Sequence, residues 1–432
     1  MIFTEKKSER LGERYFTGRH ESGLEIYLIP KDHKSAFALL GTRYGSIHRT
    51  FKTGADKDFI TVPDGVAHFL EHKLFENEDG TDTFSLFGAM GASCNAFTSN
   101  EITAYLFSAT DKYYENLEIL LKFVTTPYFT KETVEKEIGI ISQELRMYLD
   151  NPYRQLYNGL LNSMYVNSNV KIDVGGTEES ISHITADILY RCYNTFYNLH
   201  NMTLCLCGDF NCDKVAKLCD KVLKNSPDIE ISHQFPDEPD RPASKKLVKE
   251  FPIALPMFYS GIKEPDINLS SFGAELVKKD AEHRIICEML FGKSSAFYNS
   301  LYEKGLINDK FSAGYNLGRT YGFFYCAAET REPDKVNELV ANEIASARAG
   351  NFSEDFNTLF ERSKRVVYSD AVQEWNSTSD IAENFLFTLF VGGDMLDTPN
   401  IIADITPADI FARLKRSYNT DNLVTSLIIP KK

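Results

Sequence analysis

The chain has 432 residues, 43% of them apolar, and a formal net charge of −14. This length and apolar content predict two or three domains, or one fold duplicated, with cores large enough to be stable. The acidic balance argues against a general nucleic-acid binder and against a protein that binds membrane surfaces.

The sequence is not expected to carry a signal for export or membrane insertion. The first residues, Met1 to Arg10, mix acids with bases and contain no apolar core of a secretory signal. The uncharged run from Phe385 to Gly393 is far too short to span a bilayer. The eight cysteines include no C-x-x-C pair, which predicts reduced thiols in a cytoplasmic protein. Cys205-x-Cys207 with Cys212 stays open as a weak metal candidate inside an apolar strand.

The first half of the chain alternates strand and helix patterns. Asp64 is a candidate N-cap for a helix that ends near residues 77–80. Strands are predicted before this helix at residues 23–30 and within 35–48. After the helix, two strands are predicted within residues 87–107 and one at 202–208. Helices are predicted at residues 111–126, from 130 to just before Pro152, and at 178–198 and 213–223.

The composition changes to Pro, Asp, Glu, Ser and Lys near the middle of the chain. This change predicts a first domain over residues 1–230, a linker over 231–248 and a second domain over 249–432. In the second domain, strands are predicted near residues 251–262, 321–329 and 423–429, and helices near 277–291, 295–304, 332–349, 353–372, 380–392 and 406–415. The two halves have similar lengths and elements, which indicates an internal duplication.

The stretch around which the chain is organised is His68-x-x-Glu71-His72. Residues three and four apart lie on one face of a helix, so two imidazoles can bind one zinc ion and the carboxylate can reach a water beside it. The order is that of the H-x-x-E-H zinc enzymes, the inverse of H-E-x-x-H. A surface helix with solvated side chains is the alternative, which a third ligand would exclude.

A third ligand is available on the helix that begins near residue 130. Glu137 and Glu144 are seven residues apart, close to two helical turns, so they lie in one row beside the apolar stripe. A carboxylate at that border is costly unless it is paired or bound to a metal. Two histidines, one glutamate and an open position for water form a common catalytic zinc site.

With these motifs the chain resembles the inverzincin zinc peptidases, which include pitrilysin, insulin-degrading enzyme and mitochondrial processing peptidase. The resemblance implies that His68, His72 and Glu144 bind one zinc ion per chain, that Glu71 is the general base, and that Glu137 supports the ligands. Asn95, Ala96 and Phe97 resemble the family's edge strand that pairs with the substrate backbone. Gly175 to Glu178 and Met202 to Asp209 resemble two further landmarks.

The resemblance implies an α+β fold of two related repeats, each an antiparallel sheet with helices packed on one face. Family members enclose a chamber with four such domains, so a chain with two domains is expected to form a dimer. The activity implied is that of a zinc metalloendopeptidase that hydrolyses peptides or unfolded segments.

One departure concerns the second half. Family members usually have an Arg and a Tyr seven residues apart there, whereas the matching stretch, Leu301 to Asp309, is one residue shorter and has Tyr302 in place of the Arg. Arg319 and Tyr321 lie nearby without the family's spacing. This departure predicts a heterodimer with a homologous zinc-free subunit that supplies the Arg and Tyr, with a homodimer as the alternative.

Two other functions remain open at this point. Some family members are non-catalytic scaffold subunits, although such proteins usually lose their metal ligands. Another possibility is an enzyme that trims a precursor peptide in the pathway of a modified product, which differs in substrate and not in chemistry.

Overall fold

The computed structural model describes residues 1–265, 267 and 272–431. The described residues form two compact units, each assembled from separate stretches of the chain. Unit 1 consists of residues 1–146, 172–235 and 374–390, and unit 2 consists of residues 147–171, 236–373 and 391–432.

Unit 1 is built on a seven-stranded sheet with the strand order β1-β2-β3-β9-β4-β8-β7. Its strands are β1 (Thr4–Ser8), β2 (Glu13–Arg19), β3 (Glu25–Pro30), β4 (Ala36–Thr42), β7 (Ala92–Thr98), β8 (Thr103–Ala109) and β9 (Met202–Gly208). Only β3 and β9 pair in parallel among these strands as described. Every residue of β4 and β9 is buried, as expected of central strands covered on both faces.

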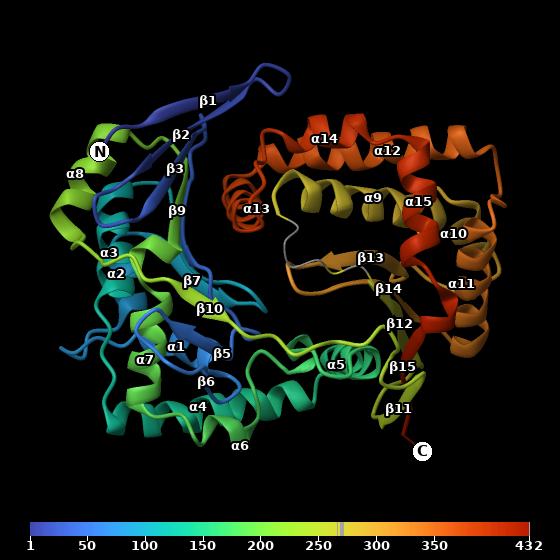
Figure 1. Cartoon of the computed structure of the whole chain (residues 1–432), viewed down its shortest axis with the longest axis horizontal. Helices are drawn as coiled ribbons and strands as arrows, with labels where there is room; N and C mark the ends of the chain where they lie inside the picture. Colours follow the sequence, from blue (N-terminus) through green and yellow to red (C-terminus); the bar gives the residue numbers. More distant parts are fainter. Residues whose placement is uncertain (266, 268–271, 432) are drawn as a thin grey trace. The chain divides into compact units, whose positions relative to one another are not determined.

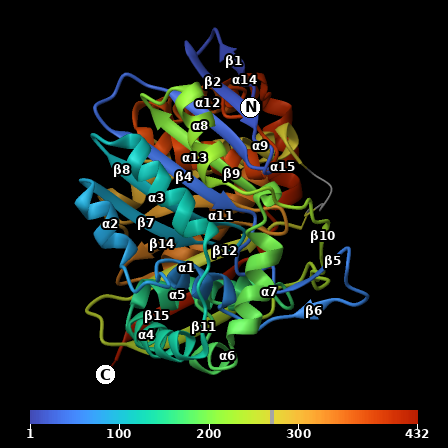
Figure 2. The ribbon, with the colours of Figure 1, turned by 90° about the vertical axis from the view of Figure 1, so that its left-hand side faces the viewer.

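Helices cover both faces of this sheet. The helices of unit 1 are α1 (Val66–Leu74), α2 (Thr83–Ala89), α3 (Tyr113–Thr125), α4 (Lys131–Leu149, whose last three residues fall in unit 2), α6 (Glu178–Ile181), α7 (Ala186–Phe196), α8 (Cys212–Val222) and α13 (Thr378–Phe390). Figure 1 shows α3 and α8 on one side of the strands and α13 on the other, and Figure 2 shows α3 and α8 in front of the sheet. A small second sheet has the order β10-β5-β6, with β5 (Thr50–Thr53), β6 (Ile60–Thr61) and β10 (Ile231–His233).

Unit 2 is built on a five-stranded sheet with the order β11-β15-β12-β14-β13. Its strands are β11 (Lys246–Phe251), β12 (Met257–Lys263), β13 (Ser312–Leu317), β14 (Gly322–Glu329) and β15 (Val424–Pro430). Its helices are α5 (Pro152–Met164), α9 (Ala274–Phe291), α10 (Ala296–Glu303), α11 (Pro333–Arg348), α12 (Phe356–Gln373), α14 (Thr398–Asp404) and α15 (Pro407–Ser417).

The two sheets share one topology. Five strands of the first sheet, β3-β9-β4-β8-β7, correspond to the whole second sheet, β11-β15-β12-β14-β13, while β1 and β2 extend the first sheet. In each set of five, the first strand in the sequence pairs in parallel with the last. The last is followed by the second, fourth and third strands, all antiparallel. The predicted α+β fold of two related repeats is confirmed, with one parallel pair added to each otherwise antiparallel sheet. In unit 1 the helices are not confined to the one face that was predicted, because α13 covers the second face at β4 and β9.

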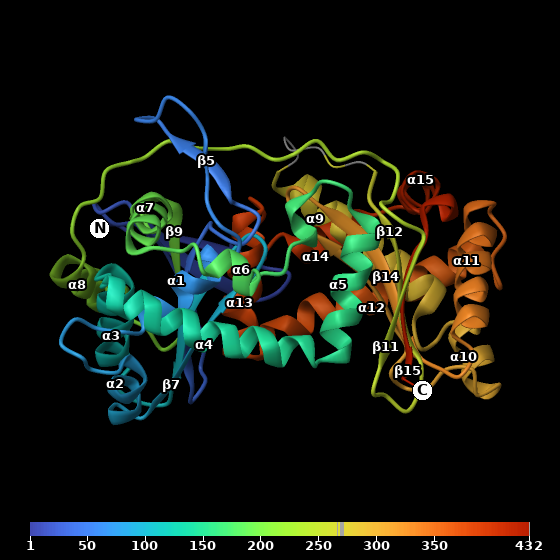
Figure 3. The ribbon, with the colours of Figure 1, turned by 90° about the horizontal axis from the view of Figure 1, so that it is seen from below.

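Each unit takes one helix from the other half of the sequence. Helix α13 packs on β4 and β9, where a Cβ on Gly41 would lie 2.5 Å from Leu386 Cδ2. Helix α5 packs on β12 and β15, where a Cβ on Gly261 would lie 2.8 Å from Met164 Cε. Figure 3 shows α5 against the sheet of unit 2. The predicted domains 1–230 and 249–432 stay a prediction, and the compact units differ from them by these two helices.

Several predicted elements have different bounds in the structure. Residues Thr83–Ala89 form α2, although a strand was predicted from residue 87, and the helix predicted over 178–198 is interrupted between α6 and α7. Pro152 does not only end α4, because Asn151 caps a new helix, α5, whose first residue is that proline. The strand predicted near 251–262 is two strands, β11 and β12, while β13 and α14 were not predicted. Among the described residues, no helix is long and apolar enough to cross a membrane.

Candidate metal centre

Helix α1 begins at a glycine and not at the predicted aspartate cap. Gly65 is the N-cap with φ 93°, a left-handed conformation that favours glycine. A Cβ at this position would lie 2.5 Å from the carbonyl oxygen of Gly175, so the chain approaches the helix start closely there. The Asp64 side chain makes an ion pair with Arg49 at 2.9 Å, so it does not cap the helix.

The sequence of α1 separates an apolar face from a polar one. Phe69, Leu70 and Leu74 are 0–1% exposed and anchor the helix in the core of unit 1. The other face carries the histidines, and the ring centroids of His68 and His72 are 4.6 Å apart. The one-turn spacing in the sequence therefore places both imidazoles side by side.

Helix α4 brings a carboxylate to this pair. Glu144 Oε2 lies 3.3 Å from Nε2 of His72, and Glu144 Oε1 lies 3.8 Å from Nε2 of His68. One ligand atom from each of the three residues lies within 4.8 Å of the other two. Among the described residues, this is the only set of three or more His, Cys, Asp or Glu side chains that meets this criterion. Figure 3 shows α4 passing α1.

Glu137 lies on the other side of the same imidazole. Its Oε1 is 3.1 Å from Nδ1 of His72, and its side chain is 11% exposed. Burial lowers the pKa of His72, but the hydrogen bonds and charges of Glu137 and Glu144 outweigh burial and raise the pKa to about 10. Two carboxylates thus favour positive charge at this imidazole. A carboxylate on Nδ1 also leaves Nε2 as the nitrogen that can bind a metal.

Glu71 is held by a threonine from the neighbouring sheet. Oγ1 of Thr98, the last residue of β7, donates a hydrogen bond to Glu71 Oε2 at 2.5 Å. Burial raises the pKa of the Glu71 carboxyl, while the Thr98 hydrogen bond and the charge of His72 act against burial. The result is a pKa above the usual value, as suits a group that accepts and returns a proton.

The loop that contains Gly175 and Gly176 packs against both helices of the centre, α1 and α4. A Cβ on Gly175 would lie 2.8 Å from Leu145 of α4 and 3.7 Å from Nδ1 of His68. Next to it, Ser180 Oγ donates a hydrogen bond to the carbonyl oxygen of Asp64, just before α1. The absence of a side chain at Gly175 therefore lets α1 and α4 approach each other beside this loop.

The predicted substrate strand is the last strand of its sheet. Asn95, Ala96 and Phe97 lie in β7, whose neighbour in the sheet is β8. Its last residue, Thr98, reaches Glu71, so this edge begins at the candidate general base. The sequence predicted this strand but not the hydrogen bond from Thr98 to Glu71. The only indication of that bond in the sequence is the hydroxyl residue that ends the Asn-Ala-Phe-Thr stretch.

The donor set fits zinc. Two imidazole nitrogens and one carboxylate oxygen are the ligands of a catalytic zinc site with an open position, whereas Mg²⁺ and Ca²⁺ prefer oxygen alone. The predicted cysteine alternative has no such set within the described residues. Cys205 and Cys207 are fully buried in β9, and burial raises the pKa of the Cys207 thiol to about 12, so it is protonated at neutral pH.

The stretch that departs from the family pattern lies in unit 2. Tyr302, in α10, is 53% exposed. The guanidinium of Arg319 lies over the ring of Phe272, 5.1 Å from its centroid, and the ring centroid of Tyr321 is 6.4 Å from that of Phe323. These side chains thus pack against neighbours within unit 2.

Family models match two parts of the chain. Residues 52–178 match the model described as Insulinase (Peptidase family M16), and residues 183–365 match the model described as Peptidase M16 inactive domain. The chain is 38% identical over 427 residues to the uncharacterized zinc protease YmfH of Bacillus subtilis, and the match covers 98% of each protein.

Solved structures resemble the whole chain. An M16-like protein from Alicyclobacillus acidocaldarius has a TM-score of 0.91 and 33% sequence identity, and the match covers 100% of this chain and 99% of that one. A peptidase M16 inactive domain from Pseudomonas fluorescens has a TM-score of 0.77 at 16% identity, over 97% of this chain and 98% of that one. At this identity, the second likeness concerns the fold alone.

Proposed function

Since this chain belongs to peptidase family M16, we propose that it is a zinc-dependent endopeptidase that hydrolyses peptides or unfolded segments. The observation that carries the proposal is the convergence of two imidazoles and one carboxylate from α1 and α4, with a second carboxylate, Glu71, beside them. The names of its relatives, which are called zinc proteases, support the same activity.

His68, His72 and Glu144 would hold one zinc ion per chain. When bound there, zinc supplies Lewis acidity, which lowers the pKa of a water to about 7 and polarises a peptide carbonyl. Glu137 would keep Nε2 of His72 directed at the ion through its contact with Nδ1, as carboxylates commonly do for zinc-binding imidazoles.

Glu71 would move the proton. Its raised pKa allows it to take a proton from the attacking water and to deliver it to the amine that leaves. The hydroxyl of Thr98 would orient the carboxylate during both steps, because its hydrogen bond to Oε2 leaves Oε1 for the water. Thr98 is a positioning residue in this scheme.

The edge strand β7 would align the substrate. An extended peptide added to Asn95, Ala96 and Phe97 would form main-chain hydrogen bonds without selecting a sequence, and its backbone would pass Glu71 at Thr98. Substrates are therefore expected to bind in extended form.

A dimer would complete the site. The Arg and Tyr usual in the family are not in place between Leu301 and Asp309, so we propose a pair with a homologous zinc-free subunit that supplies them and encloses a chamber. The solved inactive-domain protein from Pseudomonas fluorescens has the same fold as this chain, which supports a partner of this kind.

The test is the Glu71→Gln variant, assayed alone and with any homologous subunit that co-purifies. We expect it to keep about one zinc per chain by elemental analysis and to lose hydrolysis of fluorogenic peptides. Glu135→Gln is the matched control, because the Glu135 side chain is 65% exposed on α4. Hydrolysis by Glu71→Gln at the wild-type rate would contradict the proposed role, and a wild-type protein without zinc after mild purification would favour a scaffold subunit.

A further inference from the structure

One face of the sheet of unit 1 carries the metal centre. Thr98 bonds to Glu71 of α1, which places the Thr98 side chain on the face that α1 covers. Across the sheet, Thr98 is paired with Thr103 and Thr103 with Thr42, and directly paired residues share a face. Thr42 Oγ1 bonds to the carbonyl oxygen of Phe196, the last residue of α7, so α7 lies on this face too.

The opposite face carries α13. The next row of paired residues is Phe97, Ala104 and Gly41, and successive residues of a strand point to opposite faces. The two small residues leave room for the helix, since a Cβ on Gly41 would lie 2.5 Å from Leu386. At the edge of the sheet, the rings of Phe97 and Phe387 are stacked with centroids 5.9 Å apart.

This aromatic pair is accessible. Phe387 is 38% exposed and Phe97 is half-buried, and β7 is the last strand of the sheet. A peptide strand added to β7 would extend both rows, with alternate side chains on the face of α1 and on the face of α13. The side chain that continues the row of Phe97 would therefore meet two partly exposed rings.

We propose that Phe97 and Phe387 form a specificity subsite for a bulky apolar side chain of the substrate, at the position that faces away from the metal centre. The proposal rests on the peptidase function and specifies the class of substrate. The substrate would be an extended peptide with an aromatic or large aliphatic residue on the face of α13, and the residues before and after it in the peptide would point toward α1. It also gives the second half of the sequence a part in substrate binding, because Phe387 belongs to α13.

A binding experiment tests the subsite without relying on turnover. The zinc-loaded Glu71→Gln protein is titrated with fluorescein-labelled decapeptides of Ser, Lys and Ala in which a single Phe is moved along the chain. We expect at least one Phe position to bind tighter than the all-polar peptide. Phe387→Ala is expected to remove this preference, a loss of roughly tenfold in affinity, which is typical of a lost aromatic contact with its buried area.

Phe59→Ala is the matched control, because Phe59 is also 38% exposed in unit 1 but directly precedes β6, which is in a different sheet from β7, and has the Lys52 ammonium over its ring. It should leave the Phe preference unchanged, and Phe387→Leu should keep most of it. Equal loss in Phe59→Ala and Phe387→Ala, or no Phe preference in any register, would overturn the subsite. These outcomes leave the zinc content and the Glu71 dependence of hydrolysis unaffected, so they are distinguishable from failure of the proposed function.

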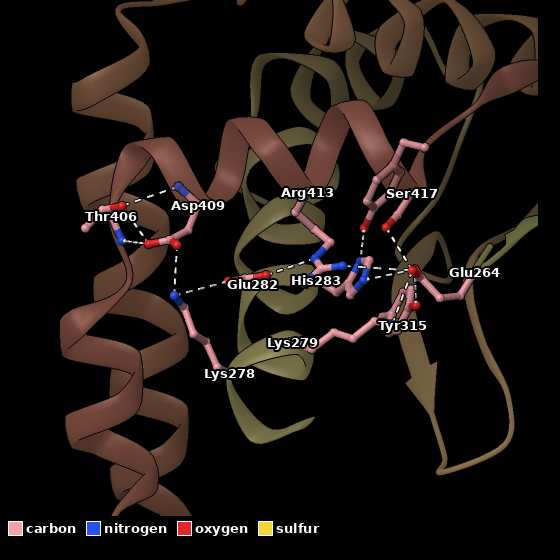
Figure 4. Close-up of polar contacts among 11 residues, drawn as sticks. Glu264, Lys278, Lys279, Glu282, His283, Tyr315, Thr406, Asp409, Arg413 and Ser417 are labelled. Carbon is pink, nitrogen blue, oxygen red and sulfur yellow. Dashed lines mark hydrogen bonds and ion pairs between the residues drawn. The ribbon is translucent and has the colours of Figure 1, made fainter. Parts of the chain in front are cut away.

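An independent observation concerns the second repeat. Helix α9 is the first helix after β12, as α1 is the first helix after β4, although β5 and β6 intervene before α1. It contains Lys279-Asp-Ala-Glu-His283, with the spacing of His68-Phe-Leu-Glu-His72 and a lysine in place of the first histidine. Figure 4 shows Lys279 and His283 pointing toward Glu264, at the end of β12. The sequence motif is thus repeated in altered form on the equivalent helix.

The geometry around Glu264 matches that around Glu144. Lys279 Nζ is 3.3 Å from one Glu264 oxygen and His283 Nε2 is 3.3 Å from the other, as the two imidazoles of α1 contact the two oxygens of Glu144. Nδ1 of His283 lies 3.1 Å from the hydroxyl of Tyr418, which takes the place that Glu137 has in unit 1.

The buried carboxylate of Glu264 is stabilised by the side chains around it. The Glu264 side chain is fully buried, and it accepts hydrogen bonds from Tyr315 at 2.7 Å and Ser417 at 3.1 Å. Burial raises the pKa of Glu264, but contacts with His283 and Lys279 outweigh it and hold the pKa well below its usual value. Burial lowers the pKa of His283 to about 4, so the imidazole is neutral at pH 7, as a metal ligand is.

We infer that the cluster of Glu264, Lys279 and His283 is the counterpart of the metal centre in the second repeat, with the Lys279 ammonium in place of a metal ion and one of its ligands. A buried carboxylate needs a nearby cation, and Lys279 provides one permanently; the guanidinium of Arg413 is a second, more distant one, with Nη1 3.9 Å from Glu264 Oε1. Unit 2 should accordingly be insensitive to chelators, and a single substitution should convert the cluster into a metal site.

Lys279→His tests this inference. We expect the variant to bind two Co²⁺ ions per chain, with the visible absorption of four-coordinate cobalt, whereas the wild type should bind one. The double variant Lys279→His/His68→Ala should bind one Co²⁺ ion, in unit 2. A variant with wild-type circular dichroism and melting temperature that binds only one ion would overturn the inference. If the variant does not fold, hydrogen exchange of the unaltered protein decides: chelation should leave the exchange of α9 unchanged, and faster exchange there would contradict the inference.

Discussion

Replacing Glu137 with glutamine tests how α4 tunes the imidazole of His72. The substitution keeps the size and an acceptor oxygen but removes the charge that lies 3.1 Å from Nδ1, in a side chain that is only 11% exposed. A hydrogen bond to a charged group contributes about 1.5–3 kcal/mol and a neutral one about 1 kcal/mol. The difference of about 0.5–2 kcal/mol corresponds to zinc binding that is weaker by roughly 2- to 30-fold.

The assay is competition for zinc against a fluorescent chelator at pH 7. Glu135→Gln is the control, because it removes the same charge from the same helix at a position that is 65% exposed. Zinc affinity should fall in Glu137→Gln and stay at the wild-type value in Glu135→Gln. If both variants bind zinc as tightly as the wild type, the contact between Glu137 and His72 does not act on the metal.

Three further predictions concern stability. Gly65→Ala should lower the melting temperature and the zinc affinity, because a Cβ would lie 2.5 Å from the oxygen of Gly175, whereas Gly80→Ala, also at positive φ but with no atom within 4 Å of the added Cβ, should affect the melting temperature only. Burial raises the pKa of Asp409, but Lys278 and a capping hydrogen bond lower it to about 2. Its stabilisation is therefore present above the ordinary value of 3.8 and lost below it, so Asp409→Asn should lower the melting temperature at pH 7 by an amount that shrinks as the pH falls from 4 toward 2. Removal of zinc should lower the melting temperature, and zinc but not Mg²⁺ should restore it, because two ligands are imidazoles.

The residues of the candidate centre could be chosen from the sequence because helical spacing is local. The interval between His68 and His72 fixes one face of α1, and the interval between Glu137 and Glu144 fixes one row of α4. The pairing of the two helices is not local, and it came from the resemblance to the family. The structure adds Gly175, whose missing side chain lets the helices approach, a role that no periodicity reveals.

The errors in the element predictions have physical causes. Helix α2 is capped by Asp82, which accepts hydrogen bonds from the amides of Phe84 and Ser85, but its aromatic residues Phe84 and Phe87 are of a type that is also common in strands. Helix α5 begins directly after α4 because Asn151 caps it and Pro152 suits a first helical position, so the proline that ends one helix also starts the next.

The exchange of helices could not be predicted from the sequence alone. Helix α13 was expected from its pattern, but its apolar face does not say which sheet it covers. Gly41 and Ala104 create the space that α13 occupies in unit 1, and such space between small residues appears only when strands are in register. The polar cluster at Glu264 was missed because the first histidine of the motif is replaced by Lys279, and because the tyrosines that contact Glu264 and His283, at residues 315 and 418, are far from them in the sequence.

Anomalous diffraction at the zinc absorption edge, from crystals grown with equimolar zinc, tests the central claim most directly. The account predicts one strong peak per chain, at about 2.0–2.2 Å from Nε2 of His68, Nε2 of His72 and a carboxylate oxygen of Glu144. A peak bound by other residues, or no peak at these three side chains in the zinc-loaded protein, would contradict it.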